Sequence, residues 1–335
     1  MIEDIKRKNM RLRNKIVESS VFIILVTAMV LVASILNEKE IIFPEIGAIV
    51  TGAVLAPKMP WTVNKKRIFI SLLVCGILGM AIVRFVPLDI ELQMIFGYFI
   101  ALLAVKISKT TFMPMISALV LPILLQTRSI WYLISLILFT GTILLIRYLL
   151  EKYGIKEKNE YFEVSEKTDL TILAFRMILV SVMIILALRF NFRYAVAPPL
   201  LVAFTEFSSA KNKAVDTMSV KIILLAELCA VSGALIRLVG ERYLGCILEP
   251  QIVLITSVVI SCLLFLMIVN GFKVFIPPFG AIVLLAYLVP KDYELWYPMH
   301  ILVGITIYTF VTKTYKWISE KAFDGFKCFM CDRYD

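Results

Sequence analysis

Three ionisable side chains interrupt long apolar runs in the second half of the chain, and their types suit charge neutralisation and proton transfer. They are Arg176, Glu206 and Glu227. An ionisable residue is costly inside apolar sequence of membrane length, so a partner and a functional role are expected for it. We predict that Arg176 neutralises one carboxylate and that the other lies on a transport path as a coupling group. The alternative is that Arg176 extends to the membrane surface and that Glu206 is solvated.

A second set of candidates surrounds four apolar stretches that each begin at proline. Proline is favoured at the first position of a helix, and the N-terminal end of a helix carries free N–H groups and a partial positive charge. Short helices of this kind would therefore bind a small anion. The candidate substrate-binding residues at or beside these starts are Pro44, Glu45, Lys109, Thr111, Pro114, Pro198, Pro199, Lys273, Pro277 and Pro278.

These candidates also have plainer interpretations. Glu45 could be a protonatable group that competes with the anion, or only a capping charge at a helix start. Lys109 and Lys273 could deepen an anion site or could be ordinary lysines of inner loops. A helix from Pro44 to Ala56 would span roughly 20 Å of a hydrocarbon core of ~30 Å, so we predict half-helices with extended lead-ins. The alternative is four tilted full crossings.

The composition requires a membrane environment. Of the 335 residues, 60% are apolar and 18% are charged, and the mean hydropathy is +0.90. A soluble core cannot bury this much apolar surface, so the predicted fold class is an all-α polytopic membrane protein. The net charge of +10 does not indicate nucleic acid, because the basic residues follow membrane topology. We find no nucleotide-binding loop, metal-ligand cluster or nucleophile with a base, so we expect no enzyme activity, no cofactor and no metal.

Apolar runs predict about twelve membrane segments, six on each side of a charged linker. With the N-terminus inside, the inner loops and tails contain 26 of the 35 Lys and Arg residues and the outer loops contain eight. This imbalance predicts a multi-pass protein of the cell membrane with both termini in the cytoplasm. Arg176 is the one basic residue predicted to be embedded. The segments are roughly 19–37, 41–56, 67–87, 90–107, 111–127, 130–150, 170–188, 195–209, 219–239, 247–270, 274–290 and 293–314.

The two halves of the chain align with each other. A shift of 154 residues places Pro44 on Pro198, and a shift of 163 places Pro114 on Pro277. A fainter repeat of three segments plus three within each half would be inverted, because its two Pro-led segments cross in opposite directions. Nested repeats of this kind occur in secondary transporters, which bind substrate near the middle of the membrane. The predicted domains are a basic segment 1–18 forming a helix on the membrane face, a first membrane repeat 19–150, a charged cytoplasmic linker 151–169, a second membrane repeat 170–315 and a cytoplasmic tail 316–335.

Two of the Pro-led stretches resemble motifs of the HPP family of small integral membrane proteins. Glu45-Ile-Gly-Ala-Ile-Val-Thr-Gly-Ala-Val-Leu-Ala-Pro57 is similar to the first motif, and Ile276-Pro-Pro-Phe-Gly-Ala-Ile-Val283 is similar to the second. Phe112-Met-Pro-Met-Ile-Ser-Ala-Leu119 is a fainter copy, so the resemblance implies a tandem member. The motif histidine is replaced by Ile276 and Met113, and its role cannot be carried over. Because family members are associated with nitrite uptake, the resemblance implies a small-anion permease.

The sequence as a whole predicts a permease for a nitrite-like anion or a small carboxylate, with its site between the repeats at the Pro-led helix starts. The expected partners are the lipid bilayer and the anionic substrate, without nucleic acid, and a homo-oligomer is left open. The alternatives are a non-transporting membrane sensor or scaffold and a protein like the aromatic-acid exporters. His300 is predicted to lie in an aromatic belt, and the sequence leaves open the role of Cys328 and Cys331.

Overall fold

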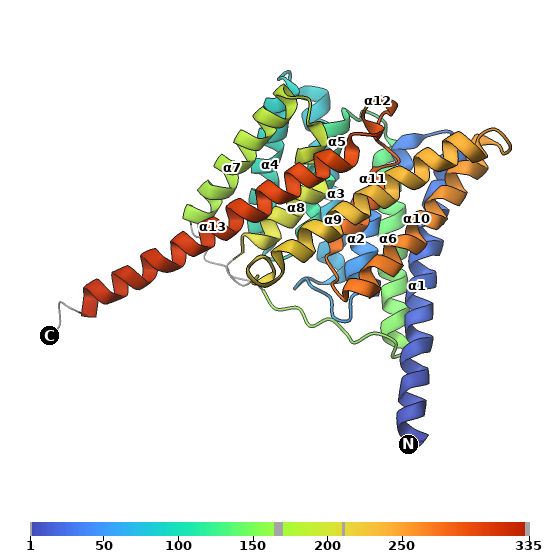
Figure 1. The fold of residues 1–335 in the computed structure, drawn as a ribbon, viewed down its shortest axis with the longest axis horizontal. Helices are drawn as coiled ribbons and strands as arrows, with labels where there is room; N and C mark the ends of the chain where they lie inside the picture. Colours follow the sequence, from blue (N-terminus) through green and yellow to red (C-terminus); the bar gives the residue numbers. More distant parts are fainter. Residues whose placement is uncertain (1, 164–169, 210–211, 332–335) are drawn as a thin grey trace.

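The chain forms a bundle of helices in the computed structural model (Figure 1). The structure describes the backbone of residues 2–163, 170–209 and 212–331, and the side chains of residues 12–163, 170–209 and 212–319. Within this described part there is no β-strand, so the prediction of an all-α fold is confirmed.

Seven helical segments of the described chain are long and apolar enough to cross a membrane, which makes the chain a polytopic membrane protein. An eighth long helix, α13 (Tyr297–Cys331), contains 35 residues. The seven lie in α1 (Ile2–Leu36), α3 (Lys65–Phe85), α4 (Ile90–Ser108), α6 (Trp131–Lys152), α7 (Leu170–Arg189), α9 (Ala214–Val239) with the π-helical turn η4 (Gly240–Leu244), and α10 (Pro250–Phe272).

Four short helices lie between long ones, and each begins at or next to a proline that the sequence predicts to start a short helix. The longest has twelve residues, roughly 18 Å at 1.5 Å per residue, so none can cross a hydrocarbon core of ~30 Å alone. Their residues are buried almost throughout. They are α2 (Glu45–Val50), which continues as the π-helical η2 (Thr51–Leu55), α5 (Pro114–Leu125), α8 (Pro198–Phe207) and α11 (Pro277–Leu285).

The short helices form a ring at the centre of the protein. α2 contacts α11 and α5, and α8 contacts the same two helices. At the contact of α2 with α11, a Cβ added to Gly47 would lie 2.4 Å from the carbonyl oxygen of Gly280, and a Cβ added to Gly280 would lie 2.5 Å from that of Gly47. Only glycine at both positions allows the two backbones to touch.

Several helix ends and helix contacts recur in the second half at shifts of 154, 164 or 165 residues, which lie within two residues of the predicted shifts of 154 and 163. Asn37 and Asn191, which are 154 residues apart, follow α1 and α7 with positive φ angles of 54° and 63°. Lys109 and Lys273 follow α4 and α10 with φ angles of 50° and 55°. The recurring contacts are Gly79 against the carbonyl of Leu119, Gly233 against the carbonyl of Val283, and the hydroxyls of Tyr132 and Tyr297, which donate to the carbonyls of Ala118 and Ile282 at 2.7 Å each.

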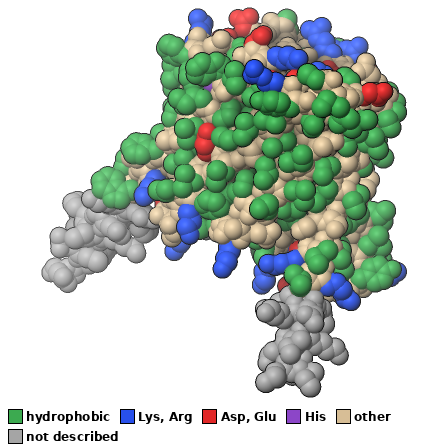
Figure 2. Space-filling view, turned by 45° about the vertical axis from the view of Figure 1, so that its right-hand side comes forward, with side chains coloured by type: hydrophobic (Ala, Val, Ile, Leu, Met, Phe, Trp, Pro, Cys, Tyr) green, Lys and Arg blue, Asp and Glu red, His purple; other side chains and the backbone are tan. Residues whose placement is uncertain are grey.

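The outer surface fits a lipid environment. Hydrophobic side chains cover the middle of the face shown in Figure 2, and Lys and Arg side chains gather above and below this band. The beginning of α1 and the end of α13 both lie toward the lower side of Figure 1, which we call the terminal side. The opposite side carries the short helix α12 (Lys291–Glu294) (Figure 1).

Two local predictions were wrong. α1 runs from Ile2 to Leu36 without a break, so the N-terminal basic segment is not a separate helix on the membrane face. The lead-in to α8 was expected to be extended, but it forms the 3-10 helix η3 (Arg193–Val196), in which backbone N–H groups bond to carbonyls three residues earlier. The lead-in to α2 likewise begins with a 3-10 turn, η1 (Lys39–Ile41).

Candidate functional site

Glu45 is the most deeply placed carboxyl group of the predicted site. It is the first residue of α2, with 1% of its surface exposed. Its Oε1 accepts a hydrogen bond from the hydroxyl of Ser117, which lies in the first turn of α5. Its Oε2 is buried and has no hydrogen-bond partner among the described residues. The structure thus brings the starts of α2 and α5 together around one carboxyl group.

The crossing of α2 and α11 fixes the position of this group. Gly47, which touches Gly280, lies only two residues after Glu45. Phe43 and Ile276 precede the two helices in the chain, and both are buried. Apolar side chains therefore lie beside the crossing of α2 and α11. A carboxylate at the N-terminal end of a helix is stabilised by the helix dipole, but a buried oxygen without a hydrogen bond is costly.

All six candidate prolines lie at the starts of the ring helices and are buried. Because α2 packs against α11 and α5 packs against α8, helices from the two halves of the chain contact each other directly. The substrate site predicted between the halves, at these helix starts, stays a prediction. These prolines are Pro44, Pro114, Pro198, Pro199, Pro277 and Pro278.

The predicted polar residues before α5 and α11 make other contacts. Lys109 is exposed and forms an ion pair with Glu163 at 3.0 Å. Thr111 accepts a hydrogen bond through its Oγ1 from the backbone N–H of Thr62 at 2.8 Å. Lys273 is exposed at the end of α10. Neither of the two partners belongs to a short helix, so these contacts tie loops together.

Arg176 is buried in α7, as predicted, and contacts the end of α8. Its Nε donates to Ser208 Oγ at 2.8 Å, and its Nη2 donates to the carbonyl of Thr205 at 3.0 Å. The predicted neutralisation of a carboxylate by Arg176 stays a prediction.

The two other coupling candidates lie in different surroundings. Glu206 accepts a hydrogen bond from Trp61 Nε1 at 3.0 Å, and Trp61 is itself buried. The Trp61 ring fills the space beside Gly52, where an added Cβ would lie 2.3 Å from it. Glu227 is partly buried in α9, and its Oε2 has no hydrogen-bond partner among the described residues. Glu206 therefore joins α8 to the loop after η2. The role of Glu227 as a coupling group stays a prediction.

Arginine side chains bind the carbonyl groups at the ends of all four short helices. These carbonyls carry partial negative charge and lack intrahelical donors, and a guanidinium offers five donors. Arg147 and Arg237 are 4% and 8% exposed, so the protein buries further arginines besides Arg176. The prediction that Arg176 alone is embedded in the membrane stays a prediction. The contacts are Arg147 to Ala53 at 2.6 Å, Arg176 to Thr205 at 3.0 Å, Arg237 to Ala286 and Val289 at 2.7 Å each, and Arg193 to Leu124.

Sequence reasoning missed Arg147, Arg193 and Arg237 as partners of the short helices, and it missed Ser117. Arg147 and Arg237 lie near the ends of apolar runs, where basic residues ordinarily face the membrane surface. The available signal was weak. Arg147 lies within the predicted segment 130–150, and Ser117 occupies the motif position that holds glycine in the second half, at Gly280.

Two cavities lie toward opposite sides of the bundle. The terminal-side cavity, of about 720 Å³, lies between the start of α3 and the end of α6. The far-side cavity, of about 650 Å³, lies beside the lead-in to α2 and the end of α11. Neither lining includes Pro44 or Glu45, so the carboxyl group is closed off from both. The far-side lining includes Lys39, Ile42, Arg237, Glu241, Tyr287 and Lys291.

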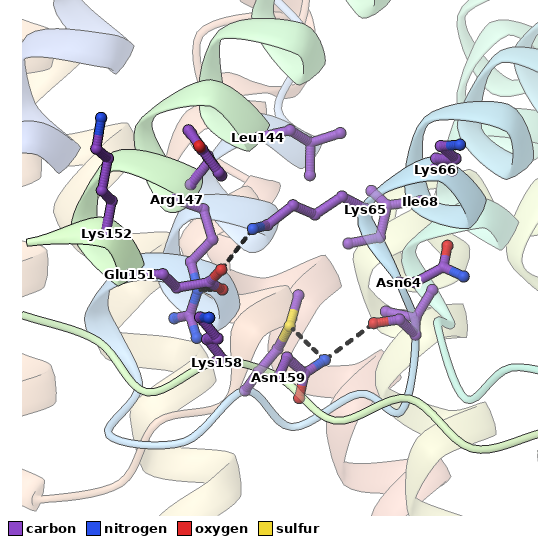
Figure 3. A pocket seen from close by; sticks show the side chains of 13 residues that line it. Asn64, Lys65, Lys66, Ile68, Leu144, Arg147, Glu151, Lys152, Lys158 and Asn159 are labelled. Carbon is purple, nitrogen blue, oxygen red and sulfur yellow. Dashed lines mark hydrogen bonds and ion pairs between the residues drawn. The ribbon is translucent and has the colours of Figure 1, made fainter. Parts of the chain in front are cut away.

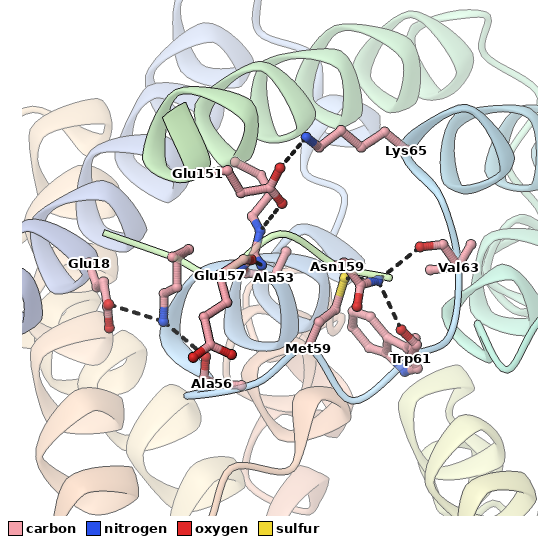
Figure 4. Close-up of polar contacts among 12 residues, drawn as sticks. Glu18, Ala53, Ala56, Met59, Trp61, Val63, Lys65, Glu151, Glu157 and Asn159 are labelled. Atoms are coloured by element: carbon pink, nitrogen blue, oxygen red, sulfur yellow. Dashed lines mark hydrogen bonds and ion pairs between the residues drawn. The ribbon is translucent and has the colours of Figure 1, made fainter. Parts of the chain in front are cut away.

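Residues 153–163 form a strap that binds the first half on the terminal side (Figure 4). Lys156 Nζ forms an ion pair with Glu18 at 3.0 Å and donates to the carbonyl of Ala56 at 2.9 Å. Burial lowers the pKa of Lys156. Asn159 Nδ2 donates to the carbonyl of Val63 at 2.9 Å. The described part of the predicted linker is thus fixed to the end of η2 and the loop that follows it.

No protein-family model, curated protein or solved structure matches this chain. Of the remaining sequence candidates, His300 is buried, and its ring centroid lies 4.9 Å from that of Phe192, whereas its neighbour Trp296 is exposed. Cys328 and Cys331 lie outside the residues whose side chains the structure describes.

Proposed function

We propose that this protein is a proton-coupled permease for a small anion, either nitrite-like or a small carboxylate, and that Glu45 is its coupling group. One observation carries the proposal. A carboxyl group is buried where the starts of three short helices meet, and one of its oxygens has no hydrogen-bond partner among the described residues. A buried ionisable group with this placement inside a membrane protein is expected to serve transport.

The chemistry follows from competition for positive charge. The N-terminal end of a helix favours an anion, and the ionised Glu45 supplies that charge when no substrate is bound. When Glu45 takes up a proton, the helix starts lose their negative partner and can bind the substrate anion instead. One proton and one anion then enter the site together. Loss of the proton on the other side restores the carboxylate and displaces the substrate.

The two cavities support a path that crosses the centre. The far-side cavity reaches Ile42, which precedes α2, and the terminal-side cavity reaches Met59, which follows η2. The element that bears Glu45 therefore separates two cavities on opposite sides of the bundle. Alternating access would require α2 and α11 to rock about their contact at Gly47 and Gly280, as one half of a transporter rocks against the other.

The proposal includes the finer organisation of the chain. We infer twelve membrane segments in two homologous halves, with both termini in the cytoplasm and the protein in the cell membrane. The recurring positive-φ helix ends and the recurring tyrosine contacts support the duplication. The resemblance to the HPP family belongs to the same proposal. Its support is that Gly47 and Gly280, the glycines of the two motif copies, touch each other.

Uptake by reconstituted protein tests this function. The purified protein is placed in liposomes, and uptake of nitrite, nitrate, formate and benzoate is measured with and without an inward proton gradient. We expect saturable uptake of at least one anion that the gradient accelerates. In Glu45→Gln the gradient-driven part should fall at least tenfold, because the side chain can no longer exchange a proton. The matched control is Glu38→Gln, the same chemical change in the loop after α1.

Two results would contradict parts of the proposal. An unchanged response of Glu45→Gln to the proton gradient would remove Glu45 from the coupling step. The absence of saturable uptake for all four anions, in protein that retains its thermal unfolding transition, would favour a non-transporting membrane sensor or scaffold. Uptake of benzoate alone would favour a protein like the aromatic-acid exporters.

A further inference from the structure

The terminal-side cavity has the features of a binding site that the transport proposal does not use. It opens between the first turn of α3 and the last turns of α6, and the strap and the loop after η2 close its other side (Figure 3). Its volume of about 720 Å³ would hold a phosphate-bearing headgroup and the first part of its acyl chains.

The lining of this cavity is strongly basic. It contains five cationic side chains and one carboxylate, Glu151. Glu151 is already neutralised, because it forms ion pairs with Lys65 and Arg147. The positive charge that remains is carried by lysines that have no carboxylate partner among the residues whose side chains are described. These lysines are Lys66, Lys152 and Lys158.

Arg147 is held by the protein and is not available to a ligand. Its three nitrogens donate to Glu151 at 2.8 Å, to the carbonyl of Ala53 at 2.6 Å and to the carbonyl of Glu157 at 2.7 Å. The first turn of α3 adds its positive end to the same space, since α3 begins at Lys65. An anionic group such as a phosphate would match this charge.

The cavity also continues into surfaces that face lipid. On α3, the spacing of Lys66, Ile70 and Val74 places them on one face of the helix, and both apolar side chains are exposed. On α6, Leu145 and Lys152 share a face in the same way, and Leu145 is exposed. Each helix therefore presents an apolar face to the bilayer that ends in a lysine at the cavity.

An aromatic residue marks the boundary between the two environments. Tyr148 lines the cavity and is 52% exposed, and Lys65 Nζ lies 5.1 Å from the centre of its ring. Tyrosine is enriched at the level of the lipid headgroups, where one end of the side chain is apolar and the other is wet. A free phosphate compound would use the lysines but not the apolar faces beside them.

We propose that the terminal-side cavity binds an anionic phospholipid, with its headgroup at the basic lining that includes Lys66, Lys152 and Lys158 and its acyl chains along the seam of α3 and α6. Basic pockets between membrane helices on the cytoplasmic side are suited to such headgroups. The lipid would tie the strap to the ends of both helices. This inference does not rest on the proposed transport function.

Lipid binding to the purified full-length chain tests the inference. Native mass spectrometry and thermal unfolding in a neutral detergent would be recorded with dioleoyl phosphatidylglycerol, dioleoyl phosphatidylcholine and water-soluble glycerol phosphate. We expect saturable binding and a rise in Tm with phosphatidylglycerol alone. The triple variant Lys66→Gln, Lys152→Gln, Lys158→Gln should bind it at least tenfold more weakly.

The matched control changes three exposed lysines outside the cavity: Lys106→Gln, Lys213→Gln, Lys313→Gln. It should bind phosphatidylglycerol like the unchanged protein. Equal weakening in the control triple, or equal binding of phosphatidylcholine, would overturn the proposal in favour of a diffuse surface effect. A rise in Tm with glycerol phosphate as large as that with the lipid would also overturn it, because the site would then belong to a soluble phosphate compound.

Discussion

The two halves of the chain share a backbone arrangement at the centre but not its chemistry. In the first half, Glu45 and Ser117 meet at the starts of two short helices. The positions that correspond to them at shifts of 154 and 163 residues are Pro199 and Gly280. One half therefore contributes a carboxyl group and its hydroxyl donor, and the other contributes a proline in the first turn of a helix and a close backbone contact. Under the proposed duplication, the two halves would share the scaffold, while the polar site would depend on residues of the first half.

The arginines at the ends of the short helices also differ between the two halves. Each short helix needs a donor for its last carbonyls, and each receives a guanidinium. Yet Arg147 and Arg237 come from α6 and α9, which are not equivalent helices of the two halves. The same electrostatic requirement is met from different helices of the two halves, although each arginine also pairs with a glutamate four residues later.

The largest effect is expected from removing these arginines. Arg147→Met and Arg237→Met should each lower the free energy of unfolding by about 3–5 kcal/mol. Both changes leave buried helix-end carbonyls without their charged donor, and Arg237→Met also removes the ion-pair partner of the buried Glu294. Titration with denaturing detergent, followed by circular dichroism, would measure the loss. The exposed Arg84 provides the control Arg84→Met, which should be near neutral. A large loss for only one of the two buried arginines would break the comparison.

The next effect concerns the contact between the halves. Gly47→Ala should destabilise the protein by about 1–3 kcal/mol, because the new methyl group would overlap the backbone of Gly280. Gly271→Ala in α10 is the matched control, since an added Cβ there meets nothing within 4 Å. Thermal unfolding of both variants in detergent would measure the difference. Equal Tm values for the two alanine variants would show that the helices can separate without cost.

A smaller and symmetric effect is expected at the tyrosine pair. Ala118 lacks its usual intrahelical donor because residue 122 is proline, and the hydroxyl of Tyr132 replaces it. Tyr132→Phe and Tyr297→Phe should each cost about 1 kcal/mol, since each loses one buried hydrogen bond. Tyr243→Phe, at an exposed residue, is the control. Clearly unequal costs in thermal unfolding would count against equivalent roles in the two halves.

The smallest effect is a pH dependence confined to the strap. Hydrogen bonds from Lys109 and Arg67 hold the pKa of Glu163 below its usual value. A carboxyl group with a lowered pKa stabilises the folded contact above its unfolded pKa, and this contribution is lost as the pH falls through the folded value. Hydrogen exchange of the strap should therefore be slower in the unchanged protein than in Glu163→Gln near neutral pH, and the difference should vanish in acid. A difference that persists in acid would show that the carboxylate charge is not responsible.

Much of the fold could be read from the sequence because it depends on local patterns. Long apolar runs locate the crossings, and Pro44, Pro114, Pro198 and Pro277 locate the short helices, since proline acts on its own segment. Glu45 was a candidate for the same local reason. Lys109 was expected at an anion site, but it ends α4 in a left-handed conformation and pairs with the strap.

The amino-acid sequence by itself determined that the chain is helical, that it belongs in a membrane and where its short helices begin. Only the tertiary structure decided that Gly47 contacts Gly280, that Ser117 donates a hydrogen bond to Glu45 and that Arg147 binds a carbonyl near the end of η2. The physical reason is that a helix start depends on neighbouring residues, whereas a contact between helices depends on which apolar faces pack together. Many faces of this chain are equally apolar, so only the folded arrangement distinguishes them.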